Sequence, residues 1–230
     1  MPAKRLEVTD PIMPIEFAHS FIRAAALCGI PIDSAVESTD IDSLLTIPFS
    51  KIVTMSEVLL AEAPFDTCLP IFNVLDNEPI SDFISILSTA ETLNEGMKCL
   101  LKYGPYASLG LIMYYRLAEH DDFFVIESDL PQESVRRFMI EMTAASCYRL
   151  VPAQFVKEVI LQVEFDFESG GNDKAYEDFF GCEVKFGQAQ NRIRILKGMP
   201  SMRLNSFSPV AYQRMVKKLQ EKTAVILSFQ

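Results

Sequence analysis

Hydrophobic residues in the first part of the chain recur every three or four positions, which is the spacing of amphipathic helices. This periodicity predicts helices over residues 15–28, 50–62 and 80–87. Gly29 is placed to end the first of them, and Ser50 is the expected N-cap of the second. The chain therefore opens with a block of helices.

A capping box gives the clearest local signal, at Thr92-Leu93-Asn94-Glu95. The Thr92 hydroxyl can accept a hydrogen bond from the amide three residues on, and the Glu95 carboxylate can reach back toward the preceding backbone. A further helix should start here, and Gly104 and Pro105 should end it.

The hydrophobic period changes to two around Ser108, which indicates strands. Residues 109–117 and 123–127 are expected to pair as a hairpin around a turn at 120–122. Residues 132–149 then return to the helical period.

A clean alternation of apolar and polar residues over 159–167 predicts a third strand. Its polar positions include Gln162 and Glu164, and we expect them to face water. Sheets with one solvated face are usually antiparallel.

The last part of the chain predicts a short helix over 173–180, ended by Gly181, and two short strands over 182–186 and 192–195. A final helix follows, with Ser208 as its N-cap. The predicted fold class is α+β: an N-terminal helical block, a mainly antiparallel sheet with packed helices, and a closing C-terminal helix.

The composition indicates a soluble, cytoplasmic protein. A net charge of −10 makes a nucleic-acid backbone an unfavourable partner for this chain by itself. The five cysteines are odd in number and widely spaced, as expected of reduced thiols in a cytosol. No apolar run approaches the ~18 residues of a membrane span, and the N-terminus lacks the apolar core of a signal peptide.

The sequence contains no phosphate-binding glycine loop, zinc-protease or serine-hydrolase motif. His19 and His120 lack partners at metal-ligand spacing. The carboxylate pair Asp121–Asp122 is interpreted as a solvated turn. We therefore expect no enzyme, no metal and no cofactor. A haem or gas sensor is an alternative, with His19 as its helical candidate for an axial ligand.

Three residues are candidates for ligand contact. Arg116 follows Tyr114 on one face of a strand whose other face is also apolar. This arginine lies either at the exposed end of the strand or in a partly buried pocket, where it would anchor an anion. Tyr103 lies beside the same strand and either packs in the core or contacts the ligand.

The C-terminal helix carries more apolar residues than one helix face can bury. Met215 and Leu219 belong to the expected inward stripe, and Ile226 and Leu227 continue the apolar run without a break. The segment either docks wholly into its own domain or meets a second copy of the chain. We take these four residues as the candidate dimer contact.

Two segments resemble the arabinose-binding-like N-terminal domain of AraC-type bacterial transcription regulators. The first is Tyr176-Glu177-Asp178-Phe179-Phe180-Gly181-Cys182-Glu183-Val184-Lys185-Phe186-Gly187, followed by Asn191-Arg192-Ile193-Arg194-Ile195. The second is Thr92-Leu93-Asn94-Glu95-Gly96-Met97-Lys98-Cys99-Leu100-Leu101-Lys102-Tyr103. Here Gly96 and Lys102 stand where that family usually has alanine and arginine. The aromatic residues of the first segment are interpreted as core.

The resemblance implies an effector-sensing domain over residues 1–207. Residues 208–230 would then be a helix or linker that leads to a DNA-binding domain absent from this chain. The implied partners are a small-molecule effector, a second copy of the chain, and DNA only through the absent domain. The alternative function is a stand-alone protein-interaction domain that does not act on DNA.

Overall fold

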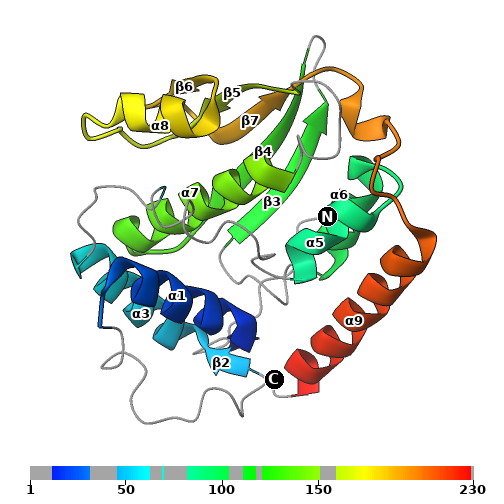
Figure 1. Cartoon of the computed structure of the whole chain (residues 1–230), viewed down its shortest axis with the longest axis horizontal. Helices are drawn as coiled ribbons and strands as arrows, with labels where there is room; N and C mark the ends of the chain where they lie inside the picture. The colour runs from blue at the N-terminus through cyan, green and yellow to red at the C-terminus, as the bar shows by residue number, and fades with distance from the viewer. Residues whose placement is uncertain are drawn as a thin grey trace.

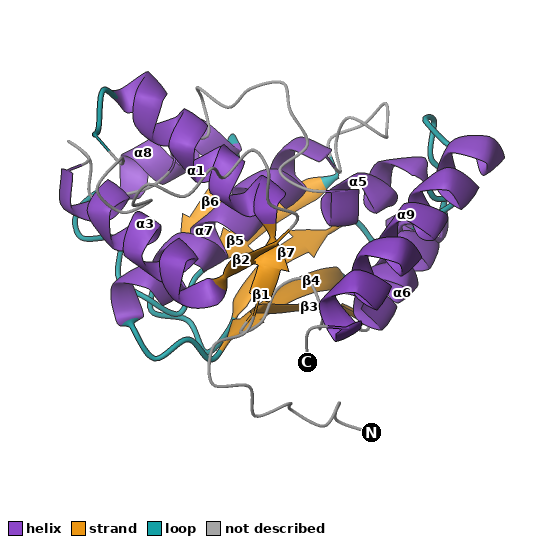
Figure 2. Cartoon of the chain, turned by 90° about the horizontal axis from the view of Figure 1, so that it is seen from below, coloured by secondary structure: helices purple, strands orange, loops and turns teal. Residues whose placement is uncertain are grey.

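A five-stranded mixed sheet lies at the centre of the computed structural model, and its helices cover one face (Figures 1 and 2). The structure describes residues 12–31, 46–62, 69, 82–103, 111–117, 121–150 and 159–228. The strand order is β3-β4-β7-β5-β6. The bounds are β3 Leu111–Leu117, β4 Asp122–Ser128, β5 Ile160–Glu164, β6 Glu183–Lys185 and β7 Asn191–Ile195.

One pair of strands in this sheet is parallel: β5 and β6 are joined by helix α8 (Asp173–Phe180), whereas the other pairs are antiparallel. Helix α8 ends where Gly181 adopts a φ of 59° and its N–H donates to the carbonyl of Glu177 at 2.8 Å. A left-handed residue of this kind suits glycine, which has no Cβ to clash. The segment that resembles the regulator family is therefore the crossover that closes this edge of the sheet.

Helix α7 (Glu133–Leu150) forms a middle layer between the sheet and the helices α1 (Ile15–Cys28) and α3 (Phe49–Glu62) (Figure 2). Every residue from 138 to 147 is buried. A helix that is enclosed on both sides has no solvated stripe. The buried Thr143 hydroxyl on this helix donates a hydrogen bond to the carbonyl of Met139, one turn back, at 2.9 Å.

Helices α5 (Asp82–Thr89), α6 (Leu93–Tyr103) and α9 (Pro209–Ser228) form a second group, beside strand β3 (Figure 1). The predicted capping box is confirmed in part: the Glu95 amide donates to the Thr92 hydroxyl at 3.1 Å. The Glu95 carboxylate accepts instead from the amide of Glu91, at 3.1 Å. The expected N-cap of α9 is confirmed, because the amide of Ala211 donates to the Ser208 hydroxyl at 3.3 Å.

The remaining elements are small. Strands β1 (Ile12–Pro14) and β2 (Thr46–Pro48) make a separate antiparallel pair, which the sequence pattern did not predict. A 3₁₀ turn, η4 (Met199–Ser201), joins β7 to the approach to α9. None of the helices in the described ranges is long and apolar enough to cross a membrane.

The α+β fold class is confirmed, but three local expectations are wrong. Asp122 does not lie in a solvated turn, because its side chain is fully buried and accepts a hydrogen bond from the amide of Gly198 at 2.9 Å. Ser50 does not cap a helix, because α3 begins one residue earlier, at Phe49.

The polar positions of β5 do not face water: Gln162 and Glu164 are 3% and 5% exposed. Their side chains are paired instead, Gln162 with Glu183 on β6 and Glu164 with Arg192 on β7. Pairing with the neighbouring strands therefore buries two polar side chains that the alternation alone predicted to be exposed to solvent.

Candidate functional site

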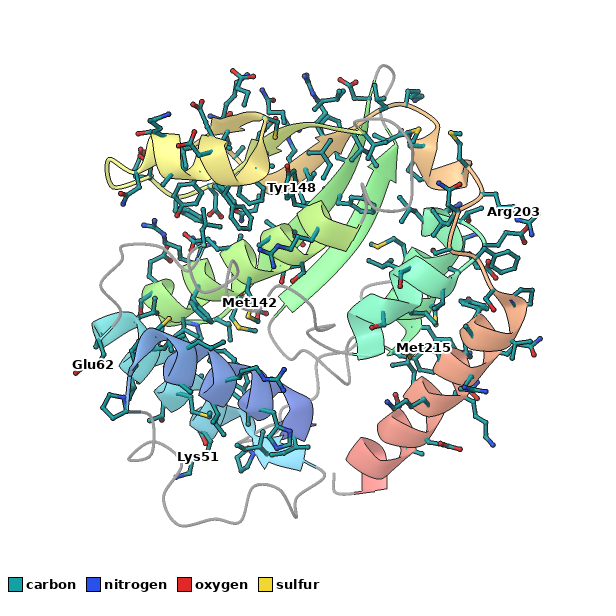
Figure 3. The ribbon with its side chains drawn as sticks, viewed as in Figure 1. Lys51, Glu62, Met142, Tyr148, Arg203 and Met215 are labelled. Atoms are coloured by element: carbon teal, nitrogen blue, oxygen red, sulfur yellow. The ribbon has the colours of Figure 1, made fainter. Side chains whose placement is uncertain are left out.

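A cavity of about 500 Å³ lies between α3, the first half of α7 and the connection from β5 to α8, and we call it the α7 cavity. Binding sites for small molecules commonly have this volume. It is lined by residues of all three segments: Leu60, Glu133, Ser134, Arg137, Phe138, Glu141, Phe167, Glu168 and Gly170. It lies beside the last turn of α3, whose end is marked by Glu62 in Figure 3.

The apolar wall of the α7 cavity is fixed by core packing. Phe138 is buried on α7, and its ring lies 5.4 Å from that of Phe21 on α1. Phe167 follows β5 and stacks on Phe165 at 4.7 Å. Leu60 adds an aliphatic side chain from α3. Because these side chains belong to the core, the apolar wall is in place before any ligand arrives.

A buried polar cluster forms the inner end of the α7 cavity. The Nε of Arg137 donates to Oε1 of Glu141 at 2.9 Å, and its Nη2 donates to the Tyr176 hydroxyl at 2.8 Å. That hydroxyl donates in turn to Oε1 of Glu141. The guanidinium carbon lies 4.7 Å from the centroid of the Phe167 ring. The cluster joins α7 to α8 and satisfies a buried carboxylate with an arginine and a phenol.

An ion-pair network lies at the outer end of the α7 cavity, where its member Glu133 belongs to the lining. Arg136 makes two hydrogen bonds to Glu133, at 2.9 and 2.8 Å, and two to Asp166, at 2.9 and 3.2 Å. The hydrogen bonds from Arg136 lower the pKa of the Glu133 carboxyl. One guanidinium therefore serves two carboxylates on neighbouring elements.

The side chains around the α7 cavity suit noncovalent binding. Apolar walls can bury the body of a ligand, and the charged groups can orient it. Across the described ranges, no group of three or more histidine, cysteine or acidic residues is placed to hold a metal ion. His19, the sequence-based candidate for an axial ligand, lies half-buried in α1.

The sequence-predicted ligand residues lie elsewhere. Tyr114 and Arg116 belong to β3, where the backbone pairs them with Val125 and Phe123 of β4. Paired positions share a face, so these two positions lie on the face that carries Arg192 of β7. No described helix covers that face in Figure 2. Their side chains lie outside the described part of the structure, and their role remains a prediction.

Tyr103 packs between helices α6 and α9. Its side chain is buried at the end of α6, and its hydroxyl accepts a hydrogen bond from Nε2 of Gln220 on α9 at 3.0 Å. It does not line the α7 cavity. The structure thus separates Tyr103 from the α7 cavity and places it where α6 meets α9.

The four predicted dimer residues all lie on α9, two in its middle and two near its C-terminal end. Leu219 is fully buried, and Met215 is half-buried and points toward the α5–α6 pair (Figure 3). Ile226 and Leu227 lie in the last turns of α9, and their side chains are outside the described residues. The first half of the stripe therefore packs within the chain, and a dimer contact remains a proposal for the second half.

Sequence reasoning missed the polar cluster of the α7 cavity. Arg137 and Glu141 are four residues apart in an expected helix, a spacing at which side chains meet. Tyr176 opens the segment that carries the family resemblance. These signals were readable, but the sequence did not show that α8 returns to α7.

Comparison with known proteins supports a regulatory class. Residues 85–198 match the family described as the arabinose-binding domain of AraC transcription regulators, N-terminal part. The crystal structure of the transcriptional regulator CdpR from Pseudomonas aeruginosa aligns with a TM-score of 0.63 at 13% identity. The alignment covers 97% of this chain and 67% of that one, and at this identity it shows a shared fold. No curated protein sequence matches the chain.

The chain thus shares, over most of its length, the fold of a transcriptional regulator of known structure. Residues 85–198 carry the N-terminal arabinose-binding-type domain of the AraC-type regulators, the family that the two sequence segments predicted.

Proposed function

We propose that this chain senses a small-molecule effector for a bacterial AraC-type transcription regulator and binds that effector in the α7 cavity. The observation that carries the proposal is the α7 cavity itself, with the buried Arg137–Glu141–Tyr176 cluster at its inner end. In this proposal the domain is not an enzyme, works in the cytoplasm, and reaches DNA only through a separate domain.

Through the polar cluster, a ligand in the α7 cavity can change the contacts between α7 and α8. Arg137 contacts the lining residue Phe167 and the α8 residue Tyr176 at the same time. A ligand that moves Arg137 must therefore disturb the hydrogen bonds between α7 and α8. Because the Glu141 carboxylate is 2% exposed, it cannot lose its partners without a large penalty, so the cluster responds as a unit.

The proposal includes a homodimer through the C-terminal half of α9, around Ile226 and Leu227. The support is the apolar run that continues beyond the buried Leu219. In a regulator, a contact at this point would set the distance between two DNA-binding units.

The test is a thermal-shift screen of the purified chain against a library of small metabolites. A ligand at about 100 times its Kd stabilises a protein by about 2.7 kcal/mol, which raises the Tm of a chain of this length by about 5–10 °C. Leu60→Trp fills the α7 cavity from α3 and should abolish the shift. Leu27→Trp is the matched control, because Leu27 is 52% exposed on α1 and does not line the α7 cavity. A shift that survives Leu60→Trp would place the ligand elsewhere.

The alternative is a protein-interaction domain without an effector. Its support is exposed apolar surface around the start of α9, where Met202 and Val210 are 52% and 67% exposed. Under this alternative no small molecule raises the Tm, and Val210→Asp abolishes binding to a protein partner while the fold is kept.

A further inference from the structure

We infer that the effector of the α7 cavity has an apolar body and a cationic group, either an ammonium or a guanidinium. This inference rests on the proposed effector-sensing function and adds the chemical class of the ligand. It is carried by the charges that face the α7 cavity and by the partners that those charges already have.

Among the described residues, Arg137 is the one arginine that lines the α7 cavity, and its side chain already has partners within the protein. Arg137 uses Nε on Glu141 and Nη2 on Tyr176, and its flat face lies against Phe167. An anionic ligand would compete with Glu141 for this guanidinium, and an anion that drew it away would leave a buried carboxylate without its counter-charge. An anion is therefore disfavoured at the inner end of the α7 cavity.

The outer end has an excess of negative charge. Arg136 is shared between Glu133 and Asp166, so one positive charge meets two carboxylates. Of these three groups Glu133 lines the α7 cavity, and Arg137 and Glu141 line it as a pair, so the described lining already carries two carboxylates and one guanidinium. Glu168 adds one more carboxylate to the lining. A cationic group would relieve this imbalance, whereas an anionic group would add to it.

The first turn of α7 does not reverse this preference. The N-terminal end of a helix attracts negative charge, but Glu133 already supplies a carboxylate in that turn. Hydrogen bonds from Arg136 lower the pKa of Glu133 still further below neutral, so this carboxylate is charged at neutral pH. The apolar part of the ligand would meet Leu60, Phe138 and Phe167, which gives a cation with an aromatic or aliphatic body a surface for each of its parts.

The experiment uses a fluorescent reporter in the full chain. The protein has no tryptophan, so Ser134→Trp places a single indole at the exposed rim of the α7 cavity. Three probes with similar bodies are titrated: 2-phenylethylamine, 2-phenylethanol and 3-phenylpropanoate. We expect the amine to bind most tightly, the alcohol less tightly and the acid least. Added salt should weaken only the binding of the amine.

Charge reversal at the rim gives the decisive comparison. Glu168→Lys in the reporter background should weaken amine binding about fivefold or more and strengthen acid binding. The matched control is Glu177→Lys, because Glu177 is an exposed carboxylate on α8 that does not line the α7 cavity. It should leave the order of the three probes unchanged.

The outcomes separate the two proposals. Tighter binding of the acid than of the amine, or an unchanged order in Glu168→Lys, overturns the cationic class but leaves a ligand-binding α7 cavity. If acid binding also depends on Arg116, the effector site lies on the other face of the sheet. If no probe changes the fluorescence and no metabolite shifts the Tm, the proposed sensing function fails together with this inference.

Discussion

Truncation of Phe180 to alanine should lower the free energy of unfolding by about 3–5 kcal/mol. Phe180 is 1% exposed at the end of α8, and its ring meets Tyr148 edge-on at 5.3 Å and Phe165 at 6.1 Å. Figure 3 shows Tyr148 on the side of α7 that faces α8, where its ring packs against Phe180. The substitution removes an aromatic anchor from both neighbouring elements.

The magnitude can be worked from the buried surface. An aromatic side chain buries about 150–250 Å², and most of the loss is apolar, worth about 25 cal/mol per Å². The whole side chain is thus worth about 4–6 kcal/mol, and because the alanine methyl remains, truncation costs about 3–5 kcal/mol. For a chain of this length, 1 kcal/mol corresponds to about 2–4 °C in Tm. We expect the Tm of Phe180→Ala to fall by about 6–20 °C.

Thermal and urea unfolding followed by circular dichroism measure this loss directly. Phe179→Ala is the control, because Phe179 is the adjacent residue but only half-buried, so it should cost clearly less. If Phe180→Ala melts within about two degrees of the parent, or if the two variants are equally destabilised, Phe180 is not a core anchor and the burial argument is refuted.

Three further predictions concern other parts of the chain. If Arg116 anchors an anionic effector, Arg116→Ala weakens the ligand-induced Tm shift and leaves the unliganded Tm unchanged; equal loss of both would make Arg116 structural. Sedimentation equilibrium at micromolar concentration should find a dimer that Ile226→Asp or Leu227→Asp dissociates into a folded monomer, and a parent chain that sediments as 25.9 kDa would exclude it. Burial raises the pKa of Cys182 to about 11 and that of Cys147 to about 12. Alkylation of Cys182, mapped by peptide mass spectrometry, should therefore speed up about tenfold per pH unit between pH 7 and about 10, whereas labelling of Cys147 should await unfolding.

The helices and most of the strands could be predicted because their signals are local. The capping box at Thr92, the glycine at 181 and the serine at 208 each act within one turn; the structure confirms the glycine and the serine, and it confirms the Thr92 hydrogen bond of the box. The pairing of β5 with β6 could not be predicted, because it depends on where a crossover helix docks. The β1–β2 pair was missed because strands of three residues are too short to carry a period.

Burial of polar residues was the least predictable property. The alternation in β5 correctly separated its two faces, but it could not show that Glu164 would meet Arg192 at 2.7 Å across the sheet. In the same way, the helical spacing of Arg137 and Glu141 was visible, whereas the hydroxyl of Tyr176 comes from 35 residues further along. The α7 cavity depends on such long-range contacts, whereas a sequence pattern reports only on residues that are close together along the chain.

The enclosure of α7 has a consequence for how this domain opens. The amides from 138 to 147 lie in a helix with protein on both sides, so they can exchange their hydrogens with water only when whole layers separate. The turn at Glu133 lies at the rim of the α7 cavity and can fray alone. Hydrogen exchange in the middle of this helix therefore reports global unfolding of the domain. Exchange in its first turn reports local opening, which an occupied α7 cavity would suppress.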